Sequence, residues 1–103
     1  MVVYNGVSDP TLLEFVVATD TDLVAAVSEK KIRVLAMVLG GLAGNAIFES
    51  ATTELFGPFL LSQGPVVLPF MASGWFETDA GEALRIDLSG TDKTGGSITY
   101  ITV

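Results

Sequence analysis

The residues best suited to chemistry are three carboxylates around Gly81, namely Glu77, Asp79 and Glu82. A pair of carboxylates can serve a glycosidase, and a cluster can hold calcium. However, the calcium-loop spacing of alternating Asp or Asn, a central Gly and a distant Glu is absent. Two carboxylates in a turn, such as Glu77 and Glu82, also lack the enclosing cleft of a glycosidase. The sequence therefore predicts a solvated turn here, with no metal and no catalytic role.

Two further motifs suggest ligands. The glycine-rich segment 40–44 is similar to a phosphate-binding loop, but it lacks the Lys-Ser/Thr ending and a following helix. Trp75 and Phe76, together with Tyr100, are candidates for a platform that stacks on a sugar ring. An adjacent aromatic pair at a strand start more often places one ring in the core and one near the surface. Carbohydrate binding is therefore kept as the alternative function.

The composition removes most catalytic chemistry. The chain has 103 residues, with no cysteine and no histidine. Without cysteine there are no disulfides, thiolate metal sites or cysteine nucleophiles. Without histidine the commonest metal ligand and the usual general base near neutral pH are missing. We predict that the protein is not an enzyme and uses no cofactor.

The charge balance is acidic, with five basic residues against twelve acidic ones and a formal net charge of −7. Nucleic-acid binding relies on clustered Lys and Arg, so no nucleic-acid partner is expected. The one basic group is Lys30, Lys31 and Arg33. It is either a charged edge that discourages sheet-to-sheet pairing or a docking patch for an acidic partner. Asp20 and Asp22 alternate in a polar turn, where they are predicted to cap backbone amides.

Apolar residues make up 50% of the chain, and its mean hydropathy is +0.57. The longest uncharged run, residues 34–48, contains Gly and Asn and is shorter than the roughly 20 apolar residues of a membrane helix. The first nine residues lack the basic start and apolar core of a signal peptide. An excess of apolar residues in a small domain therefore indicates an oligomer interface rather than a membrane partner.

Frequent turn signals divide the chain into short segments rich in β-formers. The expected strands are residues 12–18, 23–27, 32–39, 45–50, 54–61, 66–70, 82–89 and 97–103. Gly57-Pro58 interrupts one of them, because proline cannot donate to a ladder, and this marks an edge, bulge or bend. The pattern predicts an all-β fold, a compact antiparallel β-sandwich of about eight strands and jelly-roll type. Residues 11–103 form this single domain, and residues 1–10 form a short N-terminal arm.

Alternation assigns the faces of the expected strands. Leu84, Ile86 and Leu88 should point inward, with Arg85, Asp87 and Ser89 outward. We expect residues 82–89 to form a hairpin with 97–103, and 45–50 to pair with 32–39. Segment 32–39 is apolar on both faces, which suggests contact with a neighbouring subunit. The two faces are Ile32, Val34, Ala36 and Val38 against Arg33, Leu35, Met37 and Leu39.

The last third of the chain carries a longer motif. Residues 74–89 read Gly-Trp-Phe-Glu-Thr-x-Ala-Gly-Glu-Ala-Leu-x-Ile-x-Leu-Ser, and residues 95–100 read Gly-Gly-x-Ile-Thr-Tyr. Together with segment 23–35 and the Leu55-x-Gly57-Pro58 element, this pattern resembles small structural proteins encoded by tailed bacteriophages. The resemblance covers roughly residues 20–103.

Proteins of this kind are virion components, either capsid decoration (cement) proteins or modules of tails and fibres. The decoration class implies a homotrimer on the outer surface of the phage head that bridges major capsid subunits and stabilises the head. The alternative is a receptor- or carbohydrate-binding module of a tail or fibre. The residues expected at a capsid or subunit interface come from the arm, the basic group, the apolar strand and the aromatic pair. They are Val2, Val3, Tyr4, Lys30, Lys31, Arg33, Leu35, Met37, Leu39, Trp75 and Phe76.

Overall fold

A computed structural model describes residues 9–42, 44–90 and 92–103, which form nine strands and one short 3-10 helix. The first five strands are β1 (Thr11–Val17), β2 (Thr21–Val24), β3 (Ile32–Gly41), β4 (Asn45–Ser50) and β5 (Thr53–Leu60). The helix η1 (Leu61–Gln63) is followed by β6 (Val66–Leu68), β7 (Phe76–Glu77), β8 (Leu84–Leu88) and β9 (Thr94–Thr102). Among the described residues there is no helix with the length and apolarity needed to cross a bilayer.

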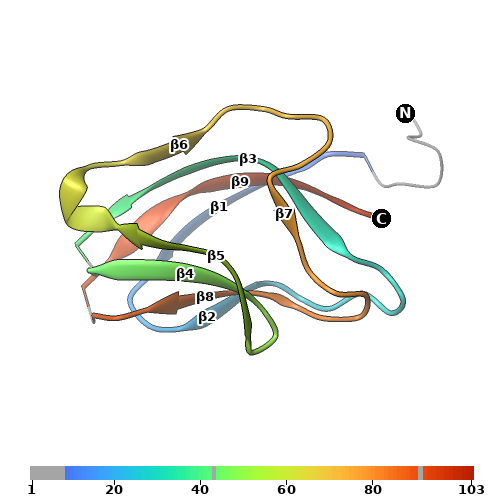
Figure 1. Cartoon of the computed structure of the whole chain (residues 1–103), viewed down its shortest axis with the longest axis horizontal. Coiled ribbons are helices and arrows are strands. Elements are labelled where there is room, and N and C mark those ends of the chain that lie inside the picture. Colours follow the sequence, from blue (N-terminus) through green and yellow to red (C-terminus); the bar gives the residue numbers. More distant parts are fainter. Residues whose placement is uncertain (1–8, 43, 91) are drawn as a thin grey trace.

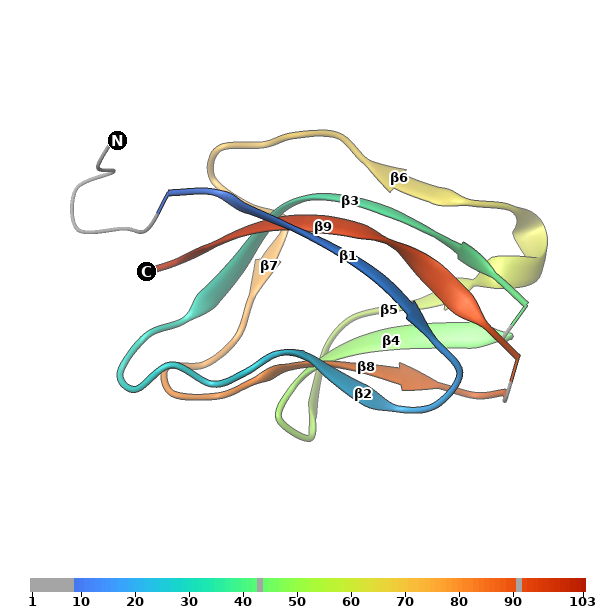
Figure 2. The ribbon, with the colours of Figure 1, turned by 180° about the vertical axis from the view of Figure 1, so that it is seen from behind.

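The strands form two antiparallel sheets that face each other (Figure 1). One sheet, named here the β1 sheet, has the order β1-β9-β3-β6, with β7 also paired to β3. The other, the β2 sheet, has the order β2-β8-β4-β5. Viewed from behind, β1 runs alongside β9 over the length of the β1 sheet (Figure 2). The predicted all-β sandwich is confirmed, and β7 is the short strand expected at the aromatic pair Trp75-Phe76.

The core lies between the sheets and is made of their inward-facing apolar residues. In β8 the predicted alternation is confirmed, since Leu84, Ile86 and Leu88 are buried while Arg85 and Asp87 are partly exposed. Phe48 lies fully buried at the centre of an aromatic cluster. Its ring centroid is 5.3 Å from that of Phe76 and 6.3 Å from that of Phe59. Aromatic pairs at these separations add to the free energy of burial.

The predicted pairing of neighbouring segments is wrong in two places. β8 and β9 do not form a hairpin, because β8 pairs with β2 and β4 while β9 pairs with β1 and β3. β3 and β4 likewise lie in different sheets. Each of these segments has an apolar face to bury. In a sandwich, consecutive strands bury such faces against each other across the core, with the connection arching from one sheet to the other.

The predicted alternation in β3 is also wrong after its first half. The register with β9 shifts between Val34 and Ala36, so Leu35 is an extra residue in a β-bulge. Ile32 and Val34 are fully buried, but beyond the bulge the inward set changes to Met37 and Leu39. A one-residue insertion exchanges the two faces of a strand because side chains alternate with period two. Val38, predicted to share a face with Val34, is therefore exposed.

Candidate interaction surface

The outer face of the β1 sheet is the most distinctive surface of the molecule, because it is apolar and exposed. Leu12 is 62% exposed, Val16 70%, Val38 47% and Val67 60%. The strand register places these side chains together. Val38 is opposite Val67 on β6 and opposite Ser97 on β9, which in turn is opposite Glu14 on β1. We call this surface the apolar face.

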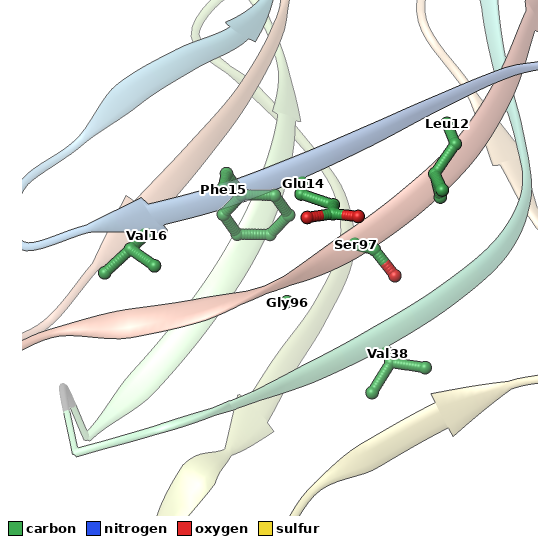
Figure 3. Close-up of a pocket in the computed structure, with 7 residues that line it drawn as sticks. All are labelled: Leu12, Glu14, Phe15, Val16, Val38, Gly96 and Ser97. Atoms are coloured by element: carbon green, nitrogen blue, oxygen red, sulfur yellow. The ribbon is translucent and has the colours of Figure 1, made fainter.

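Small residues keep the apolar face low and flat. In the rows beside Val38, the outward positions on β3 and β9 are Ala36 with Thr99 and Gly40 with Gly95. A shallow hollow of about 560 Å3 lies over this region, between β1, β9 and β3 (Figure 3). Its lining includes Leu12, Glu14, Val16, Val38 and Ser97. Glu14 is the one charged residue among those that line it. A flat apolar surface with a single carboxylate suits contact with another protein better than capture of a small ligand.

The outer face of the β2 sheet has the opposite character. Arg85 on β8 lies 3.5 Å from Asp22, 3.6 Å from Glu49 and 3.7 Å from Asp20, measured between charged atoms. The register adds Asp87 from β8 and Glu54, which is opposite Glu49. We call this surface the acidic face. Charged side chains predominate at the centre of this face, with Ile47 and Leu60 as its apolar members, so most of it is suited to contact with water.

Crowding of carboxylates shifts the pKa of several groups on the acidic face. Burial raises the pKa of Glu49, and the charge of Asp87 adds to this, while Arg85 acts in the opposite direction. A hydrogen bond with Asp20 raises the pKa of Asp87, with burial contributing. The pKa of Asp20 is lowered, chiefly by the hydrogen bond from the Leu88 backbone N–H, at 2.8 Å. The prediction that Asp20 caps its own turn is therefore wrong, because its partner is in another strand.

The basic group is largely neutralised within the chain. Arg33 Nε lies 2.8 Å from a carboxylate oxygen of Glu77, and Lys31 Nζ lies 3.2 Å from the other. Burial acts to raise the pKa of Glu77, but the hydrogen bonds and charges of Arg33 and Lys31 outweigh it and the pKa is lowered. Lys30 is exposed and forms no ion pair with another described residue. The basic group could be a charged edge or a docking patch for an acidic partner. The docking patch is the less favoured interpretation, because two of its three cations are already paired with Glu77.

Two of the three acidic residues around Gly81 help to build the turn, Glu82 through its carboxylate and Asp79 through its backbone N–H. The Ser50 hydroxyl donates to Glu82 Oε1 and accepts a 2.9 Å hydrogen bond from the Asp79 backbone N–H. Beside them the buried Thr78 Oγ1 accepts a hydrogen bond from the Ile32 backbone N–H at 2.9 Å. The predicted turn is confirmed. No group of described residues has an arrangement that would hold a metal ion.

The other predicted interface residues divide into three groups. Leu35, Met37 and Leu39 are at most 3% exposed, so the prediction that they meet a second subunit is wrong. Their side chains are already enclosed in this chain, because the bulge at Leu35 turns Met37 and Leu39 into the core. Val2, Val3 and Tyr4 lie outside the described residues. The third group is the aromatic pair.

The aromatic residues do not form an exposed platform. Phe76 and Tyr100 are both paired with Val34, so the three residues share the inward face of the β1 sheet. Both rings pack against the core. Trp75 is half-buried, and its indole N–H donates a 2.8 Å hydrogen bond to the Pro69 carbonyl oxygen. Phe76 is partly buried against the core, so its place at an interface stays a prediction, and Trp75 acts to hold the β6–β7 connection.

Leu12, Val16, Val38 and Val67 were not among the predicted interface residues, although the sequence of β1 carries a signal for two of them. It alternates Leu12, Glu14 and Val16 with Leu13, Phe15 and Val17, so both faces hold apolar residues. An edge strand in a monomer ordinarily presents polar residues to solvent on one face. Val38 could not be found in this way, because its exposure depends on the bulge.

Comparison with known protein families, curated proteins and solved structures finds no match to this chain.

Proposed function

We propose that this chain is a capsid decoration (cement) protein of a tailed bacteriophage, which trimerises on the outer surface of the head and bridges major capsid subunits. The observation that carries the proposal is the apolar face. Four exposed aliphatic side chains, those of Leu12, Val16, Val38 and Val67, gather on one flat sheet surface. Such a surface is unfavourable in water and is typical of a protein interface.

The strand pairing supports the jelly-roll part of this proposal. β4 pairs with β5, β3 with β6, β2 with β8 and β1 with β9. This is the pairing of one long hairpin. Its two arms are rolled into a sandwich by the further pairs β3–β9 and β4–β8. Double-sheet jelly rolls recur in viral capsid proteins, so the topology is compatible with a virion role. The choice of a phage rests on the motif of residues 74–100 described above.

The subunit contact in this proposal uses the apolar face rather than the basic group or the buried part of β3. A standard protein interface buries about 800 Å2 on each partner, and its energy comes from the apolar surface removed from water. Leu12, Val38 and Val67 lie on β1, β3 and β6, so the apolar face spans the width of the sheet. Nothing in the described part of this chain covers these side chains, which are all at least 47% exposed.

Sedimentation equilibrium at micromolar concentration tests the trimer. We expect a single species with three times the mass of the chain, and a clean monomer would overturn trimer formation. Location is tested separately by gold-labelled antibody on virions of the phage that encodes the chain. Label over the head surface supports the decoration role, whereas label at the tail or fibres would favour the receptor- or carbohydrate-binding alternative.

A further inference from the structure

We propose that the free edge of β1 accepts an extended strand from a different polypeptide chain, and that this strand carries a Lys or Arg opposite Glu14 with apolar residues two positions to either side. In the described chain β1 is the last strand of its sheet, paired with β9 on one side only (Figure 2). An edge strand leaves alternate backbone N–H and C=O groups unpaired, and these can bind an added strand.

β1 differs from the other sheet edges in being long and regular, although Pro10 precedes it and Glu14 places one charge on it. It is seven residues long and pairs with β9 through seven consecutive positions without a bulge. β6 has three residues and lies between Pro65 and Pro69. β5 contains Pro58 and two register shifts, and β2 has four residues and one shift. Short length, proline and bulges are the usual means of blocking an edge, so among these edges β1 is the one open to a partner.

The side chains of β1 define what the added strand should contain. On the outward side Glu14 lies between Leu12 and Val16, which are 62% and 70% exposed. Residues directly opposite in neighbouring strands interact, and opposite charges or apolar pairs are favourable. The matching strand therefore reads apolar, any residue, Lys or Arg, any residue, apolar. On the inward side Leu13, Phe15 and Val17 are only partly buried, so the added strand would also extend the core.

Glu14 argues against a second copy of β1 as the partner. In an antiparallel pair centred on Glu14 the two carboxylates would be directly opposite, which is destabilising. A register shifted by two residues, the smallest shift that keeps the same side chains on the outward face, would place Glu14 opposite Leu12 or Val16. The first eight residues contain no Lys or Arg, so the N-terminal arm of a neighbouring copy does not supply the cation from a side chain.

The other strands of this chain do not supply it either. Arg33 and Arg85 lie in β3 and β8, each already paired on both sides. Lys30, Lys31 and Lys93 lie outside the strands. The charge pattern thus identifies a different chain as the partner. If the proposed function is right, the partner chain is the major capsid protein. Only this identification of the partner rests on the proposed function.

The test is a binding titration of the full chain with labelled peptides, read by fluorescence anisotropy. The probe is acetyl-Ser-Val-Thr-Lys-Thr-Val-Ser-amide. One control peptide has Glu in place of Lys, and a second has the probe's side chains but N-methylated inner amides. We expect the probe to bind about tenfold more tightly than the Glu peptide, which corresponds to exchanging a favourable cross-strand charge pair for a repulsive one. The N-methylated peptide should not bind, because it cannot pair with a strand edge.

A charge exchange identifies the edge. Glu14→Lys should reverse the preference between the Lys and Glu peptides, whereas Glu29→Lys, in an exposed turn, makes the same change in net charge and should leave it unaltered. Equal binding of the Lys and Glu peptides by the unmodified chain would overturn the proposal, as would binding of the N-methylated peptide. The comparison of peptides needs no variant to fold, and it is independent of the sedimentation test of the trimer.

Discussion

The apolar face and the acidic face are the two outer surfaces of one sandwich, and they are built by the same alternation. On β1 the outward residues are Leu12, Glu14 and Val16, and on β8 they are Arg85 and Asp87. The inward residues of both sheets are apolar, so burial in the core does not distinguish them. The core needs one apolar face from each sheet, whereas the second apolar face of the β1 sheet is not buried within the described chain, which is why we propose that it contacts another molecule.

The largest effect is expected at a glycine that brings β9 close to β3 beneath the apolar face. A Cβ added to Gly96 would lie 1.9 Å from the Val38 carbonyl oxygen, and both atoms belong to the sheet. Gly96→Ala should therefore force the strands apart and lower the free energy of unfolding by about 3 kcal/mol or more. Urea denaturation followed by circular dichroism measures this.

Gly40→Ala is the matched control in the neighbouring strand, because its nearest contact would be Pro65 Cβ at 3.8 Å. It should change the free energy of unfolding by no more than about 0.5 kcal/mol. If the two variants were equally stable, the close approach of β9 to β3 would be contradicted.

A charge placed on the apolar face should separate the subunits without unfolding them. Val38→Asp adds a carboxylate at a position that is 47% exposed, so the folded monomer tolerates it. In a subunit contact the same carboxylate would lose its hydration without a partner, and we expect self-association to weaken at least about 100-fold. Sedimentation equilibrium measures the change.

Thr53→Asp adds the same charge to an exposed position at the start of β5, on the β2 sheet. Self-association should then stay at the level of the unmodified chain. Equal weakening by both variants would show that net charge, rather than the apolar face, controls association.

On the acidic face the corresponding substitution removes the positive charge of Arg85. Arg85 lies within 3.7 Å of carboxylates on Asp20, Asp22 and Glu49. Arg85→Met keeps the aliphatic stem but leaves these carboxylates without compensation, and we expect a loss of about 1 kcal/mol at pH 7 for this solvent-screened network. Thermal unfolding of Arg85→Met against Lys93→Met, a control that also removes one positive charge, measures it. Equal losses would mean that only the net charge matters.

The positions of the strands could be predicted from the sequence more accurately than the partners with which they pair. The strand segments follow from turn residues and period-two alternation, which are local, and Leu84, Ile86 and Leu88 were correctly assigned to the core. Which strands pair depends on how apolar faces stack across the core, so the hairpin expected for 82–89 and 97–103 was wrong. The bulge at Leu35 is set by contacts with β9, and it moved the exposed surface from Met37 to Val38. The prediction that Met37 and Leu39 meet a second subunit was wrong for this reason.

The smallest expected effect concerns pH and separates the acidic face from the Lys31–Arg33–Glu77 ion pairs on the β1 sheet. Burial raises the pKa of Glu49 in the folded chain, so the native state binds a proton more readily than the unfolded state does. The ionised Glu49 side chain therefore opposes folding at pH 7, and this cost falls as the pH is lowered through the raised pKa. Glu49→Gln removes the titration, so it should be more stable than the unmodified chain at pH 7 by about 0.5 kcal/mol at most, with the gain vanishing near pH 4.

Glu77 has the opposite sign, because its pKa is lowered in the folded chain by Arg33 and Lys31. Its contribution is present above the unfolded value of about 4.3 and is lost only as the pH falls below it through the lowered folded pKa. Glu77→Gln should therefore be less stable than the unmodified chain at pH 7, by an amount that shrinks on acidification below about pH 4. Thermal unfolding of both variants from pH 7 to pH 3 measures the two differences. If both had the same sign at pH 7, the contrast between a crowded carboxylate and a paired one would be contradicted.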